Sequence, residues 1–600
     1  MKTISSWLTS GDLFERGLLA FGVLFWLLTF FALVSSGRLA RWPRLRIALL
    51  WGFRLACATV LGLGIAQAGL YASHAAFFDP YEASVASVSG LVGVGAPLFH
   101  GPGDPVRYVQ IGYGPMLYLI NYAFIRAFGL TIQACKLASV TSYVASLLFM
   151  ARAFHRDSSR WSFLCPRGLG AAVALAVSLG YFGHWAFWTR ADPHIVLCVV
   201  LGIWALEERR FSKRAKALVL GLALGVAVNL KFTACLYFFP LFVLGFFELG
   251  WRNMLLFAAV AAAAAIFPFL LPSVSFRNYL HWLAELRKQG VGGEIAMIAN
   301  GKRALFYATP LAASWLFAAV TRARLRQSRL YMSLVFSFRL LGAKGHCHFA
   351  AIVSAFGLLV IVASKPGATE HHFVPFFPVL IHGVFRMVPR AARGLDFRVI
   401  SGLSLVLVLF GSEWNKQLSL WHTQMWARPG ARATSAEVTT FLAQHPGKTV
   451  EMGAGGSLSP TFYRPILVYA KQPYTLDVGT LSDLDSVGSG RLPAAIVKRI
   501  ERCVVDYFLI AKGTQPFKMK GIYTTGRLLF QSGYPEAFAK AYEKTETLVY
   551  YDVYACRKPT SEAPSAAPSA SASASASASA SASSPPLPSP SGSASVGATP

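Results

Sequence analysis

The chain has 600 residues, of which 54% are hydrophobic and only 14% are charged, and its mean hydropathy is +0.48. This composition excludes a soluble globular protein and indicates a polytopic membrane protein. The formal net charge of +29 and the pI near 10.0 are also found in nucleic-acid-binding proteins. Here the basic residues lie in short segments between apolar runs, which argues against nucleic acid as a partner.

Apolar runs long enough to cross roughly 30 Å of hydrocarbon recur along most of the chain and predict about 12 transmembrane helices. They cover residues 17–35, 47–71, 131–151, 169–188, 193–207, 216–230, 232–249, 253–272, 303–320, 347–364, 373–388 and 398–413. The first run follows Asp12 and Glu15 and has no small-residue cleavage site after it, so we interpret it as a retained anchor. The predicted fold class is a polytopic α-helical membrane protein.

Basic residues gather in the segments between these runs. The clusters lie at residues 38–46, 152–167, 209–216, 322–329 and 386–398. Because Lys and Arg are enriched in cytoplasmic loops, this pattern places these segments in the cytoplasm and the intervening ones outside. The topology requires that residues 113–129 do not cross the membrane. We therefore predict a large first outer loop, residues 72–130, that contains juxtamembrane helices.

The hydropathy falls after residue 413, which predicts a second domain outside the membrane. A helix start is predicted at Thr434-Ser435-Ala436-Glu437, and strands are predicted at 449–452, 504–510 and 548–554. The chain is therefore divided into a transmembrane domain, 1–413, and an outer, periplasmic α/β domain, 414–558.

Two further features concern the end of the chain. Cys503 and Cys556 lie in the predicted outer domain, where an oxidising compartment permits a disulfide, but the sequence alone leaves their pairing open. Residues 559–600 consist mainly of Ser, Ala and Pro. Such a segment cannot bury enough apolar surface to offset its chain entropy, so we predict a disordered tail without chemistry.

The predicted topology gathers several polar residues on the outer side, most of them within a few residues of a helix end. They are Asp79, Glu82, Arg190, Asp192, Lys231, Glu294, Glu370, His371 and His372. Charged groups at a bilayer edge are costly unless they are paired or used, so this gathering indicates a functional site. Glu294 differs, because it is expected within a Gly-rich loop, Gly290 to Gly293, that could act as a lid.

Four segments in sequence order strengthen this interpretation. They are Tyr113-Gly114-Pro115-Met116-Leu117-Tyr118 after the acidic Asp79-Pro80-Tyr81-Glu82 motif, Arg190-Ala191-Asp192, the glycine-to-lysine stretch 225–231, and His372-Phe373-Val374-Pro375-Phe376-Phe377-Pro378. Their order and sidedness resemble membrane glycosyltransferases of the GT-C superfamily, in particular the bacterial mannosyl- and aminoarabinosyltransferase-like members. The resemblance covers about residues 70–410 and the general plan of an outer C-terminal domain. It implies a multi-pass protein of the bacterial inner membrane whose active site faces the periplasm.

The resemblance also implies a reaction. A sugar is expected to move from a polyprenyl-phosphate-linked donor to a lipid, glycan or protein acceptor of the cell envelope, by an inverting hexosyl or pentosyl transfer. A carboxylate, Asp79 or Glu82, would take the acceptor proton, and Asp192 would hold the acceptor or a cation. Arg190 and Lys231 would bind the donor phosphate. Tyr113, His371 and His372 would line the substrate site. No cofactor is indicated, and a divalent metal stays open.

Each of these interpretations has a structural alternative. Asp79, Pro80 and Glu82 fit the N-cap, first and third positions of a helix, which is the pattern of a capping box. The family pattern usually has adjacent acids at this site, whereas Pro80 and Tyr81 separate them here, which leaves the identity of the base open. Arg190 and Lys231 are also suited to anchoring helix ends at the lipid interface.

Two other functional classes remain. A transporter or flippase would line a path through the bilayer with charged residues and would be built from inverted repeats, which are not evident in the sequence. A non-catalytic lipid-binding subunit could retain the same fold. Release of polyprenyl phosphate would separate the enzyme from both.

Overall fold

The computed structural model describes residues 43–101, 104, 106–109, 112–155, 166–288, 290, 293–325, 342–387, 410, 430–456, 459–485, 492–521, 527–531 and 533–557. The predicted span 17–35, the predicted tail and, apart from Phe410, the span 398–413 lie outside these residues. The number of about 12 transmembrane helices therefore stays a prediction.

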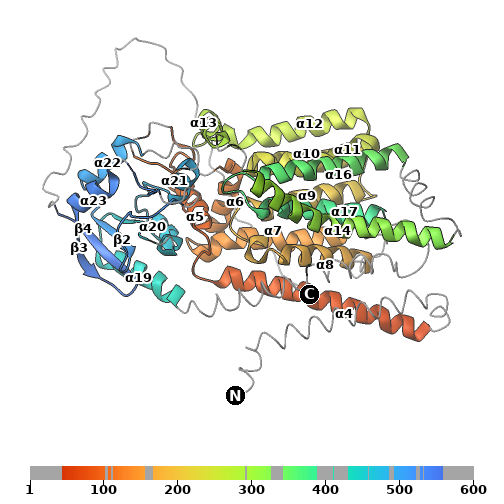
Figure 1. Ribbon diagram of the computed structural model, residues 1–600, viewed down its shortest axis with the longest axis horizontal. Coiled ribbons are helices and arrows are strands. Elements are labelled where there is room, and N and C mark those ends of the chain that lie inside the picture. Colours follow the sequence, from red (N-terminus) through yellow and green to blue (C-terminus); the bar gives the residue numbers. More distant parts are fainter. Residues whose placement is uncertain are drawn as a thin grey trace, which may run out of the picture. The chain divides into compact units, whose positions relative to one another are not determined.

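Each predicted span between residues 47 and 388 contains helical structure over at least half of its length (Figure 1). The helices of this region are α4 Pro43–Ser73, α5 Pro80–Gly93, α6 Pro115–Phe128, α7 Ile132–Ala153, α8 Pro166–Gly180, η2 Gly183–Ala186, α9 Ala191–Glu207, α10 Lys213–Leu230, η3 Phe232–Ala234, α11 Cys235–Leu249, α12 Trp251–Ile266, η4 Phe267–Leu270, α13 Phe276–Arg287, α14 Glu294–Leu325, α16 Gly342–Ala363, η5 Glu370–Phe376 and α17 Phe377–Met387.

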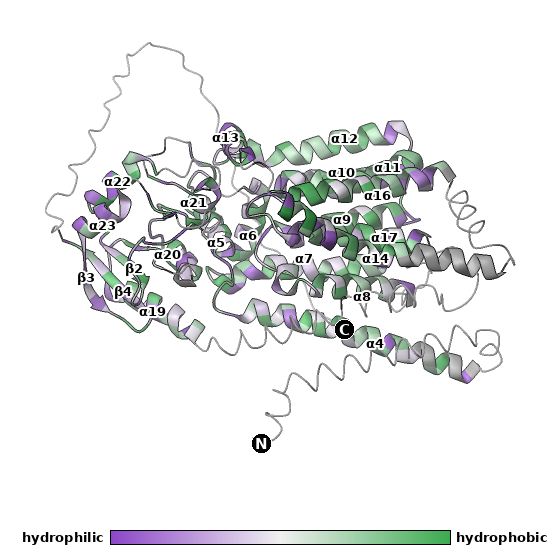
Figure 2. Cartoon of the chain, in the orientation of Figure 1, coloured by the Kyte–Doolittle hydropathy of each residue, from purple (hydrophilic) through white to green (hydrophobic). Residues whose placement is uncertain are grey.

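Five helical stretches of the described chain are long and apolar enough to cross a membrane. They are Trp51–Ser73, Ile132–Ala153, Phe232–Leu249, Trp251–Leu270 and Ala343–Ala363. Hydrophobic residues dominate α10, α11 and α12, whereas α22 (Ala494–Glu501) and α23 (Tyr534–Ala541) carry more hydrophilic residues (Figure 2). The largest cluster of buried hydrophobic residues runs through α4, α7 to α12, α14, α16 and α17.

The predicted span 169–188 is wrong in its second half. Helix α8 ends at Gly180, and the chain then passes through turns and the short helix η2 before α9 begins at Ala191. Gly183 has a φ of +60°, a conformation that favours glycine and interrupts the helix. Most of this irregular backbone is buried among other side chains, where its polar groups can be satisfied, as they could not be in lipid. It carries Trp188, Thr189 and Arg190 to the start of α9.

Helix α6 accounts for the segment expected not to cross the membrane. It has 14 residues and is therefore about 21 Å long at 1.5 Å per residue, short of the roughly 30 Å of a hydrocarbon core. It packs against α5, α7 and α10. Its length agrees with a juxtamembrane helix of the first outer loop.

Close helix packing depends on two glycines of α10. A Cβ at Gly221 would lie 2.6 Å from the Phe257 carbonyl oxygen of α12, and one at Gly225 would lie 2.4 Å from the Ala261 carbonyl oxygen. The two glycines are four residues apart, so both lie on the face that contacts α12. This packing fixes the end of α10, where Asn229 and Lys231 lie.

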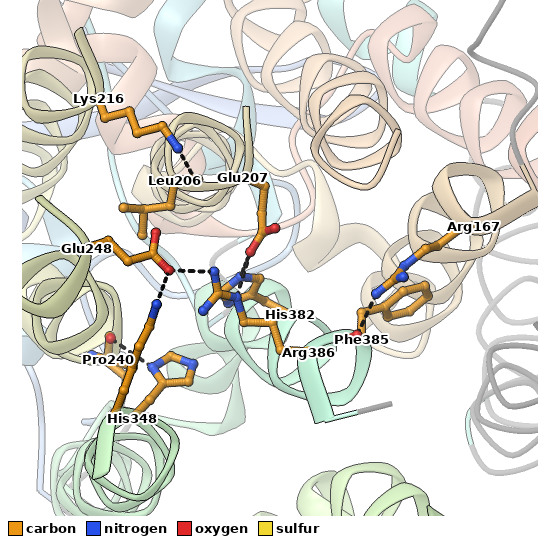
Figure 3. A network of polar contacts seen from close by, with 11 residues as sticks. Arg167, Leu206, Glu207, Lys216, Pro240, Glu248, His348, His382, Phe385 and Arg386 are labelled. Carbon is orange, nitrogen blue, oxygen red and sulfur yellow. Dashed lines mark hydrogen bonds and ion pairs between the residues drawn. The ribbon is translucent and has the colours of Figure 1, made fainter. Parts of the chain in front are cut away.

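Charged side chains join four helices at the C-terminal end of α9 (Figure 3). Glu207 accepts from Arg386 Nε at 2.6 Å and lies 3.0 Å from His382 Nε2. Glu248 accepts from Arg386 Nη2 at 2.8 Å and from Lys344 Nζ at 2.6 Å. Arg386, which the sequence placed in a basic cytoplasmic cluster, is therefore engaged in ion pairs between helices.

The strands of the described chain form one four-stranded sheet in the order β1-β2-β4-β3, near the end of the chain. They are β1 Val450–Met452, β2 Tyr507–Ala511, β3 Tyr542–Thr547 and β4 Tyr551–Cys556. β1 pairs with β2 in parallel, and the other two pairings are antiparallel. The strands predicted at 449–452, 504–510 and 548–554 are confirmed as β1, β2 and β4, although β2 and β4 each begin three residues later than predicted. Accompanying helices are α19 Gly430–Gln444, η6 Ser459–Tyr463, α20 Arg464–Tyr469 and α21 Val478–Asp485.

Two details of this region differ from, or complete, the sequence interpretation. Helix α19 begins at Gly430, before the predicted start at Thr434. Glu437 does not cap this helix, because its carboxylate accepts the backbone N–H groups of Val549 and Tyr550 at the turn between β3 and β4. Cys503 and Cys556 are joined in a disulfide, with their Cα atoms 5.7 Å apart.

Candidate active site

The acidic motif begins α5, as the helix-start interpretation predicts, but the reciprocal contact of a capping box is not formed, because Glu82 accepts the N–H of Phe78 and not that of the cap residue Asp79. Asp79 is the N-cap, and its Oδ1 accepts the N–H of Tyr81 at 2.7 Å. Pro80 occupies the first helical position, where its missing N–H costs nothing. The interpretation as a helix start is therefore confirmed, but it uses only one oxygen of Asp79.

Glu82 is fully buried and held on several sides. Its Oε1 accepts from the Tyr71 hydroxyl and from the Thr189 N–H at 2.9 Å, and its Oε2 accepts from the Phe78 N–H at 3.0 Å. These donors come from α4, from the segment before α5 and from the segment before α9. Glu82 therefore ties together the loops that carry the two predicted acidic sites.

Asp79 is in a different state, because its side chain is half-buried and reaches solvent. Among the described residues, no hydrogen bond engages its second oxygen, Oδ2. Burial raises the pKa of Asp79 above its ordinary value, and the nearby Arg190 charge opposes this shift. A carboxylate with one fixed and one available oxygen is suited to accept a proton.

Lys136 of α7 supports this loop and was not singled out from the sequence. Its fully buried ammonium donates to the carbonyl oxygens of Tyr71, His74 and Ala76 at 3.2, 3.0 and 2.6 Å. It also lies 4.4 Å from the centroid of the Tyr71 ring. A cation at the C-terminal end of α4 stabilises that helix end and fixes the segment that leads to Asp79. A lysine inside the predicted membrane span 131–151 was the available signal.

Arg190 is held between aromatic rings. Its Nε donates to the Tyr113 hydroxyl at 2.6 Å, and its Cζ lies 3.9 Å from the Trp188 ring centroid and 5.3 Å from that of Tyr81. Within the described part of the chain, its two Nη atoms have neither a hydrogen bond nor an ion pair. The guanidinium is therefore positioned through its plane and its Nε, while the fork that binds oxyanions is left available.

The Tyr113-Gly114-Pro115 segment docks on the end of α10. Gly114 N–H donates to the Leu230 carbonyl at 3.1 Å, and Met116 N–H donates to Asn229 Oδ1 at 3.0 Å. A Cβ on Gly114 would lie 1.6 Å from the Asn229 carbonyl oxygen, so only glycine permits this approach. Two of the segments that carry the family resemblance are thus in direct contact, and they place Tyr113 beside Lys231.

Asp192 and Lys231 form a buried pair. Lys231 Nζ lies 3.5 Å from Asp192 Oδ1, and Trp188 Nε1 donates to Asp192 Oδ2 at 3.2 Å. Lys231 Nζ also lies 6.0 Å from the Tyr113 ring centroid. Burial lowers the pKa of Lys231, and the Asp192 charge opposes this shift. The pair is long for a salt bridge, and it places a second cation beside the same tyrosine that binds Arg190.

The two histidines lie beside Trp188 and each other. The His371 ring is 5.3 Å from the Trp188 ring and 4.5 Å from the His372 ring, measured between centroids. His371 Nδ1 is 2.7 Å from Thr369 Oγ1, whereas His372 Nδ1 is buried and has no hydrogen-bond partner among the described residues. Burial lowers the pKa of both imidazoles, which favours their neutral forms.

Two of the polar residues that were predicted on the outer side, Glu294 and Glu370, do not lie with the other site residues. Glu294 is the first residue of α14 and is exposed, so the expectation that it lies within a loop is wrong. Glu370 accepts from the Tyr307 hydroxyl at 2.9 Å and pairs with Arg303.

A further carboxylate near the site comes from α21 and was not predicted. The Tyr81 hydroxyl donates to Asp483 Oδ1 at 3.0 Å, across 402 positions of sequence. No sequence pattern signals a contact between residues so far apart. In the described residues, no group of three or more His, Cys, Asp or Glu side chains is placed to hold a metal ion.

Among the comparisons with known proteins, the one with solved structures gives matches. No family model and no curated protein matches the chain. It is similar to ArnT from Cupriavidus metallidurans bound to undecaprenyl phosphate, with 14% identity, 85% of this chain and 98% of that chain covered, and a TM-score of 0.44. The apo state of the same ArnT gives 13% identity, the same coverage and a TM-score of 0.46.

A third match is the arabinosyltransferase EmbB from Mycobacterium smegmatis, with 11% identity, 76% of this chain and 44% of that chain covered, and a TM-score of 0.35. These structures are GT-C superfamily glycosyltransferases, the superfamily that the order of the sequence segments resembles. At these low scores the likeness transfers no function, so the function of this chain has to follow from the chemistry of its own site.

Proposed function

We propose that the chain is an integral membrane glycosyltransferase that moves a sugar from a polyprenyl-phosphate-linked donor to a hydroxyl or amine acceptor. One observation carries the proposal. A half-buried carboxylate with an available oxygen, Asp79, and a buried guanidinium with an available fork, Arg190, are brought to the same aromatic-lined site by Tyr81 and Trp188.

The two groups match the two charges that develop during transfer. The acceptor oxygen or nitrogen forms a bond to the anomeric carbon while its proton passes to Asp79. The bond between that carbon and the phosphate oxygen breaks, and its electron pair leaves with the polyprenyl phosphate. Arg190, with Lys231 beside it, stabilises the phosphate charge. An acceptor group and a leaving phosphate on opposite sides of the sugar give inversion at the anomeric carbon.

The geometry favours Asp79 over Glu82 as the base. Both oxygens of Glu82 accept hydrogen bonds in a fully buried position, so an acceptor cannot reach them without displacing backbone N–H groups. Asp79 requires no such displacement. We therefore assign Glu82 to positioning. Asp192, which the sequence interpretation placed at the acceptor or a cation, is assigned here to hold Lys231 in place.

The disulfide supports an outer location of the site. Disulfides persist in oxidising compartments such as the periplasm. The region that contains Cys503–Cys556 contacts the first outer loop, because Tyr108 N–H donates to the Thr475 carbonyl at 2.7 Å. The site beside this loop then faces the same compartment, and the cell membrane is the site of action.

Transfer assays on purified protein in lipid nanodiscs test the proposal. With a polyprenyl-phosphate sugar as donor, wild-type protein should release polyprenyl phosphate in amounts equal to glycosylated acceptor. Asp79→Asn should reduce kcat by roughly 10²- to 10⁴-fold, the usual contribution of a general base. Asp104→Asn is the matched control, because Asp104 Oδ1 caps a turn of the same loop and the amide retains that oxygen.

Two results would refute the proposal. Asp79→Asn with the turnover of wild-type protein would remove the base. Donor movement across the membrane without cleavage of the sugar–phosphate bond would instead identify a flippase.

A further inference from the structure

Helix α21, which follows Thr475, packs against α5 beside the proposed site. Asp477 begins α21 as its cap, since its Oδ2 accepts the Thr480 N–H at 2.6 Å, and its Oδ1 accepts from the hydroxyl of Ser84 on α5. The Asp477 N–H in turn donates to the Tyr108 carbonyl at 3.1 Å. Asp477 is fully buried, so α5 and α21 are joined without intervening solvent.

Tyr81 lies between the α5–α21 contact and the proposed catalytic groups, Asp79 and Arg190. Its N–H donates to Asp79, its ring faces the Arg190 guanidinium and its hydroxyl donates to Asp483. The ring packs on the backbone of α21, because a Cβ at Gly479 would lie 3.1 Å from two carbons of the Tyr81 ring. Tyr81 thus contacts the proposed base, the proposed phosphate ligand and the C-terminal region at once.

We propose that Asp483 is a positioning residue for transfer, which acts by holding Tyr81 against Arg190; this inference rests on the proposed function. The Asp483–Tyr81 hydrogen bond fixes the tyrosine ring, and the ring fixes the face of the guanidinium whose Nη atoms meet the donor phosphate. Tyr81, one of the two residues that separate acids which are adjacent in the family pattern, then has a role of its own. The C-terminal region contributes to the rate of transfer as well as covering the site.

The surroundings of Asp483 raise the pKa of its carboxyl group, so its ionisation should be visible in the pH dependence of transfer. Burial raises the pKa of Asp483 to about 7, and the carboxylates of Asp477 and Asp79 add to this shift, while the Tyr81 hydroxyl and Arg190 oppose it. Asp483 is a better hydrogen-bond acceptor when ionised. Transfer by wild-type protein should therefore increase as the pH rises through neutrality, and part of this increase should belong to Asp483.

The test is a double-mutant cycle with Tyr81→Phe and Asp483→Asn, measured as kcat, as KM for donor and acceptor, and as a pH profile. Hydrogen bonds to charged groups contribute enough to predict a loss of kcat of roughly tenfold in each single variant. The double variant should lose no more than either single variant, because both remove the same contact. Asp483→Asn should also lose the part of the increase in kcat near neutral pH that belongs to Asp483.

Asp506→Asn serves as the control, because Asp506 is a carboxylate of the same region that binds Thr449 instead of Tyr81. Tyr81→Phe retains the ring on Gly479, so it tests the contact even when Asp483→Asn folds poorly. Single variants with the kcat and pH profile of wild-type protein, or losses that multiply in the double variant, would overturn the role of Asp483 alone. A wild-type protein that transfers no sugar would overturn the proposed function, and this inference with it.

Discussion

Substitutions of the two acids of α5 are expected to fail in opposite ways. Asp79→Asn keeps an oxygen for the Tyr81 N–H, so the cap and the fold should persist while the base is lost. Glu82→Gln keeps one oxygen and replaces the other with an amide nitrogen that cannot accept. One of the buried donors, most directly the Phe78 N–H, would then lose its acceptor.

The expected loss of stability in Glu82→Gln follows from the contacts of Glu82. Loss of one hydrogen bond to a charged acceptor costs about 1.5–3 kcal/mol, and a buried N–H without a partner costs about 1–3 kcal/mol. These terms overlap because they describe the same broken contact, so we expect Glu82→Gln to lower the stability by about 3 kcal/mol. Its kcat should decrease by roughly tenfold, since the carboxylate positions the loops without taking part in proton transfer.

Thermal unfolding in nanodiscs and turnover of the folded fraction measure the two effects separately. Asp79→Asn should show unchanged unfolding and almost no turnover, whereas Glu82→Gln should unfold at a lower temperature and retain turnover. Glu82→Asp is the companion variant: it keeps the charge but shortens the side chain, so it should recover part of the stability. A stable Glu82→Gln protein without turnover would contradict this assignment and make Glu82 the base.

Three further variants test how the site is held. Lys136→Met removes the ammonium that binds three carbonyl groups before Asp79, and a resulting displacement of the loop by about 1 Å should reduce kcat by roughly 10²-fold. Lys288→Met is the control at an exposed lysine. Equal turnover in both variants would contradict the role of Lys136. Gly114→Ala places a methyl group against the Asn229 carbonyl and should lower turnover strongly, whereas Gly101→Ala, which meets nothing within 4 Å, should not. Arg190→Gln should weaken donor binding. Because the Arg190 charge lowers the pKa of Asp79, the variant should also show the increase of kcat/KM at higher pH. A pH profile unchanged in position would contradict the electrostatic contact between Arg190 and Asp79.

The sequence allowed prediction of many of the residues that meet in the site but not of what each one does. Asp79, Arg190, Asp192, Lys231 and the two histidines were expected together because of sidedness, and their positions in the structure agree with that expectation. The assignment of Glu82 required its partners, since a capping box and a catalytic acid have the same residue pattern.

Lys136 and Asp483 were missed for different reasons. Lys136 lies within a run that reads as an ordinary membrane span, and its role depends on carbonyl groups that every residue possesses. Asp483 reaches the site only because the C-terminal region packs on α5, and such long-range contacts leave no periodic pattern in the chain.

The orientation of α9 joins the site to the charged cluster at its other end. Its N-terminus carries Arg190 and Asp192, so the helix dipole adds positive potential where the donor phosphate is proposed to bind. The same dipole makes the C-terminal end negative, and Glu207 there adds a charge of unfavourable sign. Arg386 offsets this charge, and Arg386 and His382 together tie α9 to α17, as Figure 3 shows. Loss of Arg386 should therefore destabilise α9 and act on transfer only through the position of Arg190.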